Sequence, residues 1–183
     1  MQRVLLKFES LQQIAGTEEV AVILLTDEAR SRVLSVVCDA EMTHQLLLRL
    51  RGKRAVTRTM LPEALLHLMH STYEMLIVGI YDGQYQVMLM DTEKGTSVRV
   101  RMSDAVLLSL ISNIPLYIEA QLWEKQNAPY DENAPGVAIP INTMDMSRLK
   151  AALQNAVDEE NYELASHLRD EINSRSQTPA HLP

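Results

Sequence analysis

Several features that mark common enzyme classes are scarce in this sequence. Only six of its 183 residues are glycine, and Cys38 is the single cysteine. The scarcity of glycine argues against a phosphate-binding glycine loop or a dinucleotide-binding fingerprint, and neither motif is found. One cysteine cannot form an intrachain disulfide or a paired-cysteine zinc site. Because no signal peptide is recognisable either, we expect a cytoplasmic protein.

Long apolar runs and excess positive charge are also missing. No run approaches the roughly 20 apolar residues that span a bilayer, so we expect no membrane partner. The formal net charge is -7, which excludes a nucleic-acid coat protein with a basic surface throughout. Hydrophobic residues make up 46% of the chain, enough for a packed core in one domain plus a smaller unit.

Apolar residues follow a strand period in the first part of the chain. The clearest turn signal is Asp82-Gly83, which lies between two apolar runs and predicts a hairpin. Strands are predicted at residues 4–8, 20–25, 33–37, 75–81, 85–90 and 116–118. Helical spacing between some of these strands gives an α+β fold, with a mixed or antiparallel sheet and packed helices.

Two helices are predicted between the third strand and the hairpin. Asp39 offers an N-terminal cap for the first, which has Glu41 near its start. The second begins at Thr59 and has Pro62 in its first turn. Its apolar residues recur at helical spacing, so we expect them to face the core: Leu61, Leu65, Leu68 and Met69.

The stretch from Ser97 to Ile118 predicts a strand, a helix and a second strand. Ser103 can cap the helix, and Asp104 lies in its first turn, where a negative charge suits the helix dipole. Arg101 ends the preceding strand. One interpretation is a purely structural pair between Arg101 and Asp104. The other is a site for an anion or a metal at the strand-to-helix junction. Asp82 and Asp91 are further candidate acids.

One segment concentrates positive charge in this acidic protein. Five cations fall within ten positions: Arg49, Arg51, Lys53, Arg54 and Arg58. The segment is either a solvated loop or a patch that contacts the phosphates of a nucleic acid. No aromatic residue interleaves the cations, so stacking on bases is not indicated there.

The composition changes after Trp123. Residues 127–145 are rich in proline and predict a linker with little regular structure, and residues 177–183 predict a disordered tail. Between them, residues 146–176 predict a helical hairpin. Its expected inward residues are Leu149, Ala152, Leu153, Ala156 and Val157, then Tyr162, Ala165, Leu168 and Ile172. Its outer face is acidic, and we expect it to bind a partner protein or a second copy, giving a homo-oligomer.

Residues 1–126 resemble the bifunctional nuclease domain family, named for DNase and RNase activity in some members. Arg101-Met102-Ser103-Asp104-Ala105-Val106 is similar to the family pattern Arg-x-Ser-Asp-Ala-Ile, and Ile114-Pro115-Leu116-Tyr117 is similar to Ala-Pro-Ile-Tyr. Residues 149–175 resemble the UVR motif of nucleotide-excision-repair proteins, on Ala156–Glu163 and Ala165–Ile172. The order of the two segments is similar to that of bacterial members.

The resemblance implies a hydrolase that cleaves phosphodiester bonds of DNA or RNA. We expect Asp104 and Glu41 to be catalytic and to hold Mg²⁺ or Mn²⁺, because hard divalent cations favour carboxylate oxygen. Arg101, Arg54 and Arg58 would bind the substrate phosphate, and Ser103 belongs to the motif.

The chain departs from the family pattern at two places that bear on catalysis. Arg99 stands where the family commonly has an Asp, two places before the motif Arg. Where the family typically has Arg-Pro-Leu-Thr-His-Asp, this sequence reads Arg54-Ala55-Val56-Thr57-Arg58-Thr59, so that Arg58-Thr59 replaces a His-Asp pair. The alternative function is therefore a catalytically degenerate interaction or regulatory module, which binds protein or a phosphate-bearing ligand.

Overall fold

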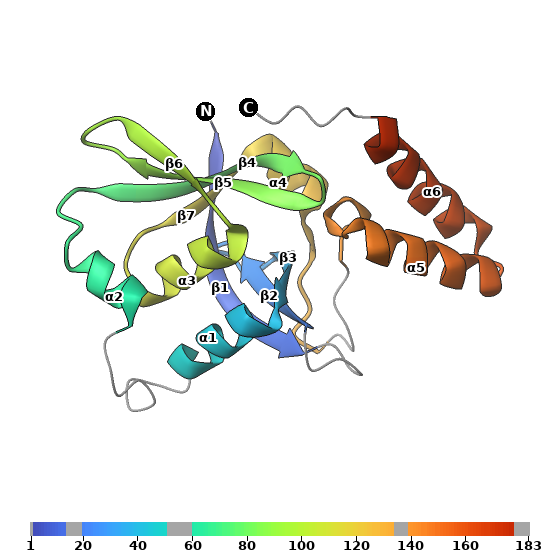
Figure 1. Cartoon of the computed structure of the whole chain (residues 1–183), viewed down its shortest axis with the longest axis horizontal. Coiled ribbons are helices and arrows are strands. Elements are labelled where there is room, and N and C mark those ends of the chain that lie inside the picture. The colour runs from blue at the N-terminus through green and yellow to red at the C-terminus, as the bar shows by residue number, and fades with distance from the viewer. Residues whose placement is uncertain (1, 14–19, 51–59, 134–138, 178–183) are drawn as a thin grey trace. The chain divides into compact units, whose positions relative to one another are not determined.

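The computed structural model describes residues 2–13, 20–50, 60–133 and 139–177 (Figure 1). The chain forms two compact units. The first comprises Met1–Gly79 and Tyr85–Ala138, and the second comprises Ile80–Gln84 and Ile139–Pro183. Each unit is described by itself below.

An eight-stranded sheet is the frame of the first unit. Its strands are β1 (Arg3–Gln13), β2 (Val20–Thr26), β3 (Arg32–Asp39), β4 (Tyr73–Tyr81), β5 (Gln84–Asp91), β6 (Thr96–Val100), β7 (Leu116–Glu119) and β8 (Ala128–Pro129). Their spatial order is β6-β5-β4-β7-β1-β2-β3-β8. β4 and β7 pair in parallel, whereas β1 pairs antiparallel with both β2 and β7. The predicted α+β fold is confirmed.

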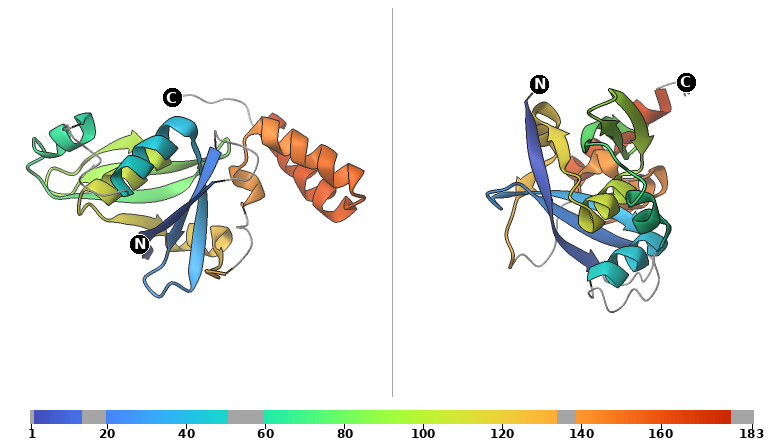
Figure 2. Two further views of the ribbon diagram at one scale, coloured as in Figure 1. Left: turned by 90° about the horizontal axis from the view of Figure 1, so that it is seen from below. Right: turned by 90° about the vertical axis from the view of Figure 1, so that its left-hand side faces the viewer.

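The first unit also contains helices. They are α1 (Ala40–Leu50), α2 (Leu61–Leu66), α3 (Met102–Ile111) and α4 (Ala120–Gln126). α1 contacts β2, β3 and α3, and α3 also contacts β3 and β7 (Figure 2). The six residues from Ala21 to Thr26 are all buried, as expected of a continuous apolar strand covered on both faces.

The β4–β5 turn follows the sequence signal closely. Asp82 and Gly83 both have positive φ, 47° and 75°. A two-residue turn of this kind matches the right-handed twist of the two strands that it joins, and glycine adopts such φ values without a steric cost.

α1 begins where the sequence predicts. Asp39 closes β3, and its Oδ1 accepts a hydrogen bond from the Met42 amide at 2.8 Å. The side chain thus caps the helix by satisfying one of the amides that have no intrahelical partner. Glu41 follows in the first turn, where the helix dipole favours a negative charge.

α2 contradicts the prediction made for its apolar residues. Thr59 lies outside the described residues, and the helix begins at Leu61. The relative exposures of Leu61, Leu65 and Leu68 are 71%, 50% and 72%, so the prediction that they face the core is wrong. The physical reason is an ion pair between Arg49 of α1 and Glu63, which orients the polar face of α2 toward α1.

The second unit is mainly a helical hairpin. α5 (Met146–Asp158) and α6 (Tyr162–Gln177) follow a short 3-10 helix, η1 (Ile141–Thr143). Asp145 caps α5 by accepting from the Arg148 amide at 2.8 Å. The core of the hairpin contains Leu149, Ala156, Ala165 and Leu168, with Ile141, Met144, Ala152, Leu153 and Ile172 packed against it.

Two residues predicted to face the hairpin core are exposed instead. Val157 is 46% exposed and Tyr162 is 67% exposed. Both lie next to the turn between the helices, where Glu160 adopts a positive φ of 57° and the chain reverses. Val157 lies at the end of α5 and Tyr162 at the start of α6, so neither helix extends far enough past the turn to cover these side chains. No helix among the described residues combines the length and hydrophobicity needed to cross a membrane.

Candidate functional site

A fork between Arg101 and Asp104 stands at the start of α3. Arg101 donates from Nε to Oδ2 of Asp104 at 2.8 Å and from Nη2 to Oδ1 at 3.1 Å. Two parallel charge-assisted bonds fix both side chains in one plane. The side chains are nevertheless accessible, at 68% for Arg101 and 36% for Asp104, so a ligand can reach them from solvent.

The prediction that Ser103 caps α3 is wrong. The helix begins at Met102, Arg101 occupies the N-cap position in an extended conformation, and no side chain caps the helix there. Ser103 therefore lies one position inside the helix. The Arg101–Asp104 pair, separated by three residues, bridges the N-cap and the first turn in place of a hydroxyl cap.

The start of α1 lies in the electrostatic neighbourhood of this fork. The hydrogen bonds to Asp104 are the main cause that raises the pKa of Arg101, and attraction to Asp39 and Glu41 raises it further. α1 and α3 are in contact, and each begins directly after a strand, α1 after β3 and α3 after β6. Residues at least 60 positions apart in sequence thus lie within electrostatic range of one another, and we call this group the fork site: Asp39, Glu41, Arg101 and Asp104.

Charge at the fork site is negative overall, since Arg101 is paired with Asp104 and two further carboxylates, Asp39 and Glu41, lie within electrostatic range of it. A phosphodiester would be repelled by this arrangement unless a cation offset the charge. Among the described residues, no three His, Cys, Asp or Glu side chains gather closely enough to hold a metal ion. Mg²⁺ does not need such a cage, because it commonly binds one or two carboxylates together with water and substrate phosphates. Each oxygen of Asp104 keeps a lone pair beyond its bond to Arg101.

Comparison with family models adds the decisive observation. The model of the bifunctional nuclease domain matches residues 22–131, more than half of the chain, and the UvrB/UvrC motif matches residues 146–176. The chain belongs to the bifunctional nuclease domain family. A comparison with curated proteins found no match. All four residues of the fork site fall within the matched part of the bifunctional nuclease domain.

The basic segment of this bifunctional nuclease domain is described only at its start. Arg49 is just 5% exposed and forms a bidentate ion pair with Glu63, at 2.8 and 3.0 Å. It also donates to the backbone oxygen and to Oε1 of Gln45, both at 2.8 Å. The interpretation of Arg49 as a phosphate contact is therefore wrong, because all of its charge is used inside the fold. Arg51, Lys53, Arg54 and Arg58 lie outside the described residues.

Burial and the ion pair with Arg49 act on the pKa of Glu63 in opposite directions. Burial is the largest single influence and by itself would raise the pKa of the Glu63 carboxyl. The hydrogen bonds from Arg49, a backbone hydrogen bond and the positive charge of Arg49 together outweigh burial, so the pKa is lowered. A carboxylate that stays ionised and a buried guanidinium stabilise each other, and removal of either would leave the other unpaired. The sequence could have suggested this pair, since Arg49 and Glu63 end and begin successive helices.

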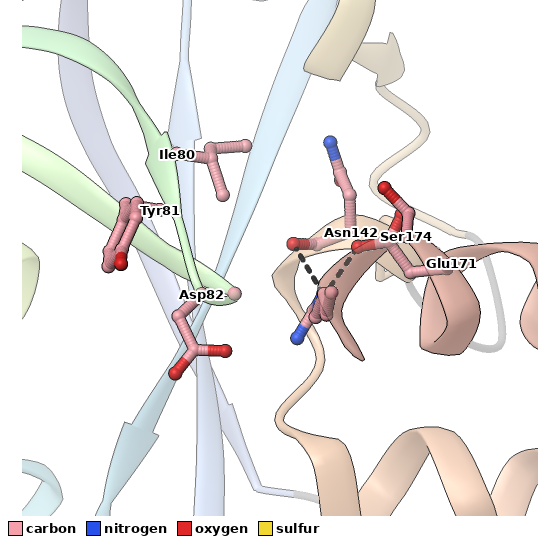
Figure 3. A pocket seen from close by; sticks show the side chains of 8 residues that line it. Ile80, Tyr81, Asp82, Asn142, Glu171 and Ser174 are labelled. Atoms are coloured by element: carbon pink, nitrogen blue, oxygen red, sulfur yellow. Dashed lines mark hydrogen bonds and ion pairs between the residues drawn. The ribbon is translucent and has the colours of Figure 1, made fainter. Parts of the chain in front are cut away.

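A pocket of about 470 Å³ lies in the second unit, and the candidate acid Asp82 is part of its wall (Figure 3). Its wall includes Asp82, Asn142, Glu171 and Arg175. The Arg175 guanidinium donates to Glu171 at 2.7 Å and to the carbonyl oxygens of Met144 and Asn142 at 2.6 and 2.9 Å. Because its cation is already committed, this pocket is poorly suited to bind a phosphate, and we assign it a structural role.

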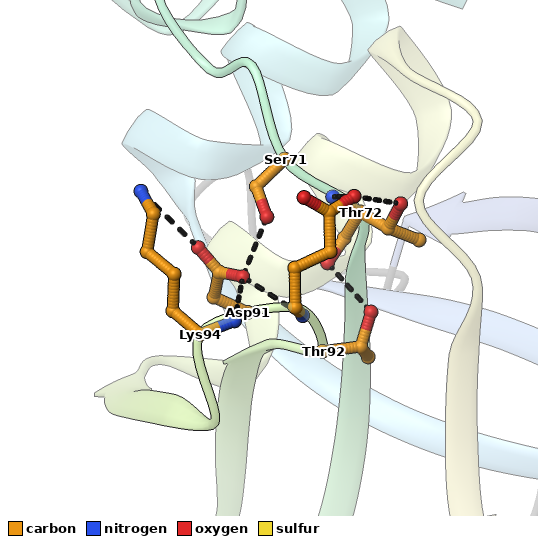
Figure 4. Close-up of polar contacts among 6 residues, drawn as sticks. Ser71, Thr72, Asp91, Thr92 and Lys94 are labelled. Carbon is orange, nitrogen blue, oxygen red and sulfur yellow. Dashed lines mark hydrogen bonds and ion pairs between the residues drawn. The ribbon is translucent and has the colours of Figure 1, made fainter.

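Asp91, a candidate acid in the sequence, anchors a turn instead (Figure 4). Its Oδ1 accepts from the Ser71 hydroxyl at 2.5 Å and from the amides of Glu93 and Lys94 at 3.1 and 2.9 Å. These bonds lower the pKa of the Asp91 carboxyl, with the Ser71 bond as the main cause. The carboxylate joins the β5–β6 turn to the segment before β4. We therefore assign Asp91 a structural role and not a catalytic one.

Proposed function

We propose that this chain hydrolyses phosphodiester bonds of DNA or RNA at the fork site. The observation that carries the proposal is the Arg101–Asp104 fork, which stands in the motif of a nuclease family with Glu41 within electrostatic reach. Arg101 differs from the enclosed Arg49 and Arg175 because its side chain is 68% exposed. Only its Nε and Nη2 are bound to Asp104, so the guanidinium can contact phosphate while it is paired. Carboxylates at helix starts are suited to hard cations.

Roles follow from the chemistry of each side chain. Glu41 and Asp104 would hold Mg²⁺ or Mn²⁺, because both offer accessible carboxylate oxygens. When bound, the cation would offset negative charge on the substrate and lower the pKa of bound water. Arg101 would orient the phosphate beside the carboxylates. Arg54 and Arg58 supply further positive charge in the sequence and complete the proposed phosphate contacts.

Digestion assays test this proposal directly. Single-stranded and duplex DNA and RNA are incubated with Mn²⁺ and with the full chain or its variants. We expect Asp104→Ala and Glu41→Ala to slow cleavage by at least about a hundredfold, because each removes a proposed ligand of a cation that would supply several kcal/mol of charge stabilisation. Asp170→Ala, which alters an exposed acid of α6, is the matched control and should cleave at the wild-type rate. Equal activity in Asp104→Ala and wild type would remove Asp104 from the mechanism.

A non-catalytic module is the second candidate. It is favoured by the Arg58-Thr59 sequence in place of the family's His-Asp pair and by the engagement of Arg49 inside the fold. This function predicts no cleavage by any variant in any metal, together with binding of a phosphate-bearing ligand or a protein. Salt separates the ligands, because affinity for nucleic acid should fall steeply as salt rises.

The hairpin of residues 146–176 would serve contact with another polypeptide. Its UvrB/UvrC motif and its acidic outer face both favour a protein partner over nucleic-acid phosphates. We place this activity in a bacterial cytoplasm, where a reduced Cys38 is expected.

A further inference from the structure

α2 carries an exposed apolar ridge that the fold of one copy does not cover. We call Leu61, Leu65 and Leu68 the leucine ridge. Their relative exposures of 71%, 50% and 72% place them among the most exposed large hydrophobic residues of the described chain. Leu61 and Leu65 are four residues apart and lie on one side of α2. Leu68 lies in the turn that follows the helix, where its amide donates to the Leu65 carbonyl at 2.9 Å. Leu50, at the end of α1, is 42% exposed as well.

Contacts between α1 and the opposite face of α2 keep Leu61 and Leu65 turned toward solvent. Glu63 is separated from Leu61 and Leu65 by two positions, so it projects from the opposite face of the helix. There it binds Arg49, whose Nη2 also lies 3.4 Å from the sulfur of Met60 at the start of α2. A bidentate ion pair with one partner 5% exposed is a firm anchor. The outward orientation of the leucines is therefore built into the packing of α2 on α1.

An exposed ridge of three leucines is unusual for a protein that works alone, since contiguous apolar patches on soluble proteins commonly mark contact sites. We propose that the leucine ridge is the contact surface of a homodimer, in which the ridges of two copies pack against each other. This assignment differs from self-association through the hairpin of residues 146–176.

Charge is the first reason to choose a second copy as the occupant. Two chains of net charge -7 repel each other over most of their surfaces. From Met60 to Met69 the sequence holds one formal charge, that of Glu63, and Arg49 neutralises it. The ridge is thus a surface on which two copies can approach without uncompensated like charges.

Self-complementary spacing is the second reason. A twofold axis makes the same patch face itself, so that residue i meets residue j and j meets i. With two α2 helices antiparallel, Leu65 meets Leu65 of the other copy, and Leu61 meets Leu68. In this arrangement the short α2 of each copy and the turn after it present their apolar side chains to the same elements of the other copy. Antiparallel helices also bring opposite dipole ends together.

A charge at the centre of the ridge tests the proposal. In Leu65→Glu, the twofold axis would bring two carboxylates together in an apolar contact. We expect the wild-type full chain to sediment as a monomer–dimer equilibrium, and Leu65→Glu to raise the dimer dissociation constant at least about tenfold. Two matched controls, Val98→Glu and Tyr162→Glu, place the same charge on other exposed apolar residues, in β6 and at the hairpin turn. Both should dimerise like wild type.

Crosslinking gives a second readout that does not depend on loss of a signal. The only native cysteine, Cys38, is buried and its burial raises the pKa of the thiol, so it should not interfere. With diamide as the oxidant, Leu65→Cys should form a disulfide-linked dimer within minutes, at least about tenfold faster than the control Val98→Cys. Reduction should return the monomer on a denaturing gel.

Three results would overturn the proposal. The first is a wild-type chain that stays monomeric at all concentrations. The second is equal crosslinking rates for Leu65→Cys and Val98→Cys. The third is loss of the dimer in Tyr162→Glu while Leu65→Glu keeps it, which would assign self-association to the hairpin. None of these readouts depends on nuclease activity.

Discussion

The guanidinium of Arg49 and the carboxylate of Glu63 form two parallel bonds of 2.8 and 3.0 Å between α1 and α2. This pair decides two functional questions together. It removes Arg49 from the cations that could contact phosphate, and it turns the leucines of α2 outward. A basic residue at the edge of a positive segment thus acts in packing, because its charge is matched by a partner from the next helix.

Replacement of Arg49 should reduce stability without a direct effect on nucleic-acid binding. We expect Arg49→Ala to lower the free energy of unfolding by about 1–3 kcal/mol, since the partly exposed Glu63 carboxylate loses its two hydrogen bonds and the buried side chain of Arg49 is removed. Urea unfolding measures the change, and Lys150→Ala, at an exposed position of α5, is the control. The salt dependence of DNA binding under native conditions should stay the same. A shallower salt slope in Arg49→Ala would mean that Arg49 does contact phosphate.

Asp104→Asn should separate binding from cleavage. The substitution removes one negative charge from the fork site and weakens the hold on Arg101. We therefore expect affinity for single-stranded DNA in the presence of EDTA to rise about threefold or more, while Mn²⁺-dependent cleavage is lost. Fluorescence anisotropy measures the first effect, with Asp170→Asn as the control on α6. An unchanged affinity would show that phosphate does not approach Arg101.

Asp91 should make stability depend on pH in acid. The pKa of its carboxyl is lowered in the folded state, mainly by the Ser71 hydroxyl. A lowered pKa means that the group stabilises the fold above its unfolded pKa of about 3.9, and that this contribution is lost as pH falls through the folded value. Asp91→Asn should therefore be less stable than wild type at pH 6, and the difference should shrink toward pH 3.

Urea midpoints at several pH values measure that difference, with Asp170→Asn as a control that should track wild type throughout. A gap between Asp91→Asn and wild type that stays constant from pH 6 to pH 3 would contradict the ionised role of Asp91. The loss would then come from the geometry of the turn alone.

Removal of residues 144–183 should leave the first unit folded. The hairpin has its own core around Leu149 and Leu168, and the first unit keeps its sheet and helices without it. We expect the circular dichroism of the truncated chain to lose helical signal only, and its activity per folded molecule to be nearly unchanged. Light scattering should still report two copies through the leucine ridge, while binding of a hairpin partner disappears. An unfolded remainder would show that the hairpin belongs to the main core.

Local sequence determined those features that depend on neighbouring residues. Asp82-Gly83 specified its turn because few residue pairs adopt two positive φ angles easily. Asp39 specified the start of α1, since its short carboxylate reaches the amide of Met42 three positions on. The spacing of apolar residues likewise predicted the strands, the α+β class and the helical hairpin.

Tertiary structure decided which faces and which distant residues meet. The period of Leu61, Leu65 and Leu68 defines a face but carries no information on whether that face looks inward, and the answer came from the bond between Arg49 and Glu63. In the same way, the first turns of α1 and α3 share a site only because both helices pack on β3. Contacts between segments far apart in the chain depend on the whole packed fold, and a local pattern does not contain them.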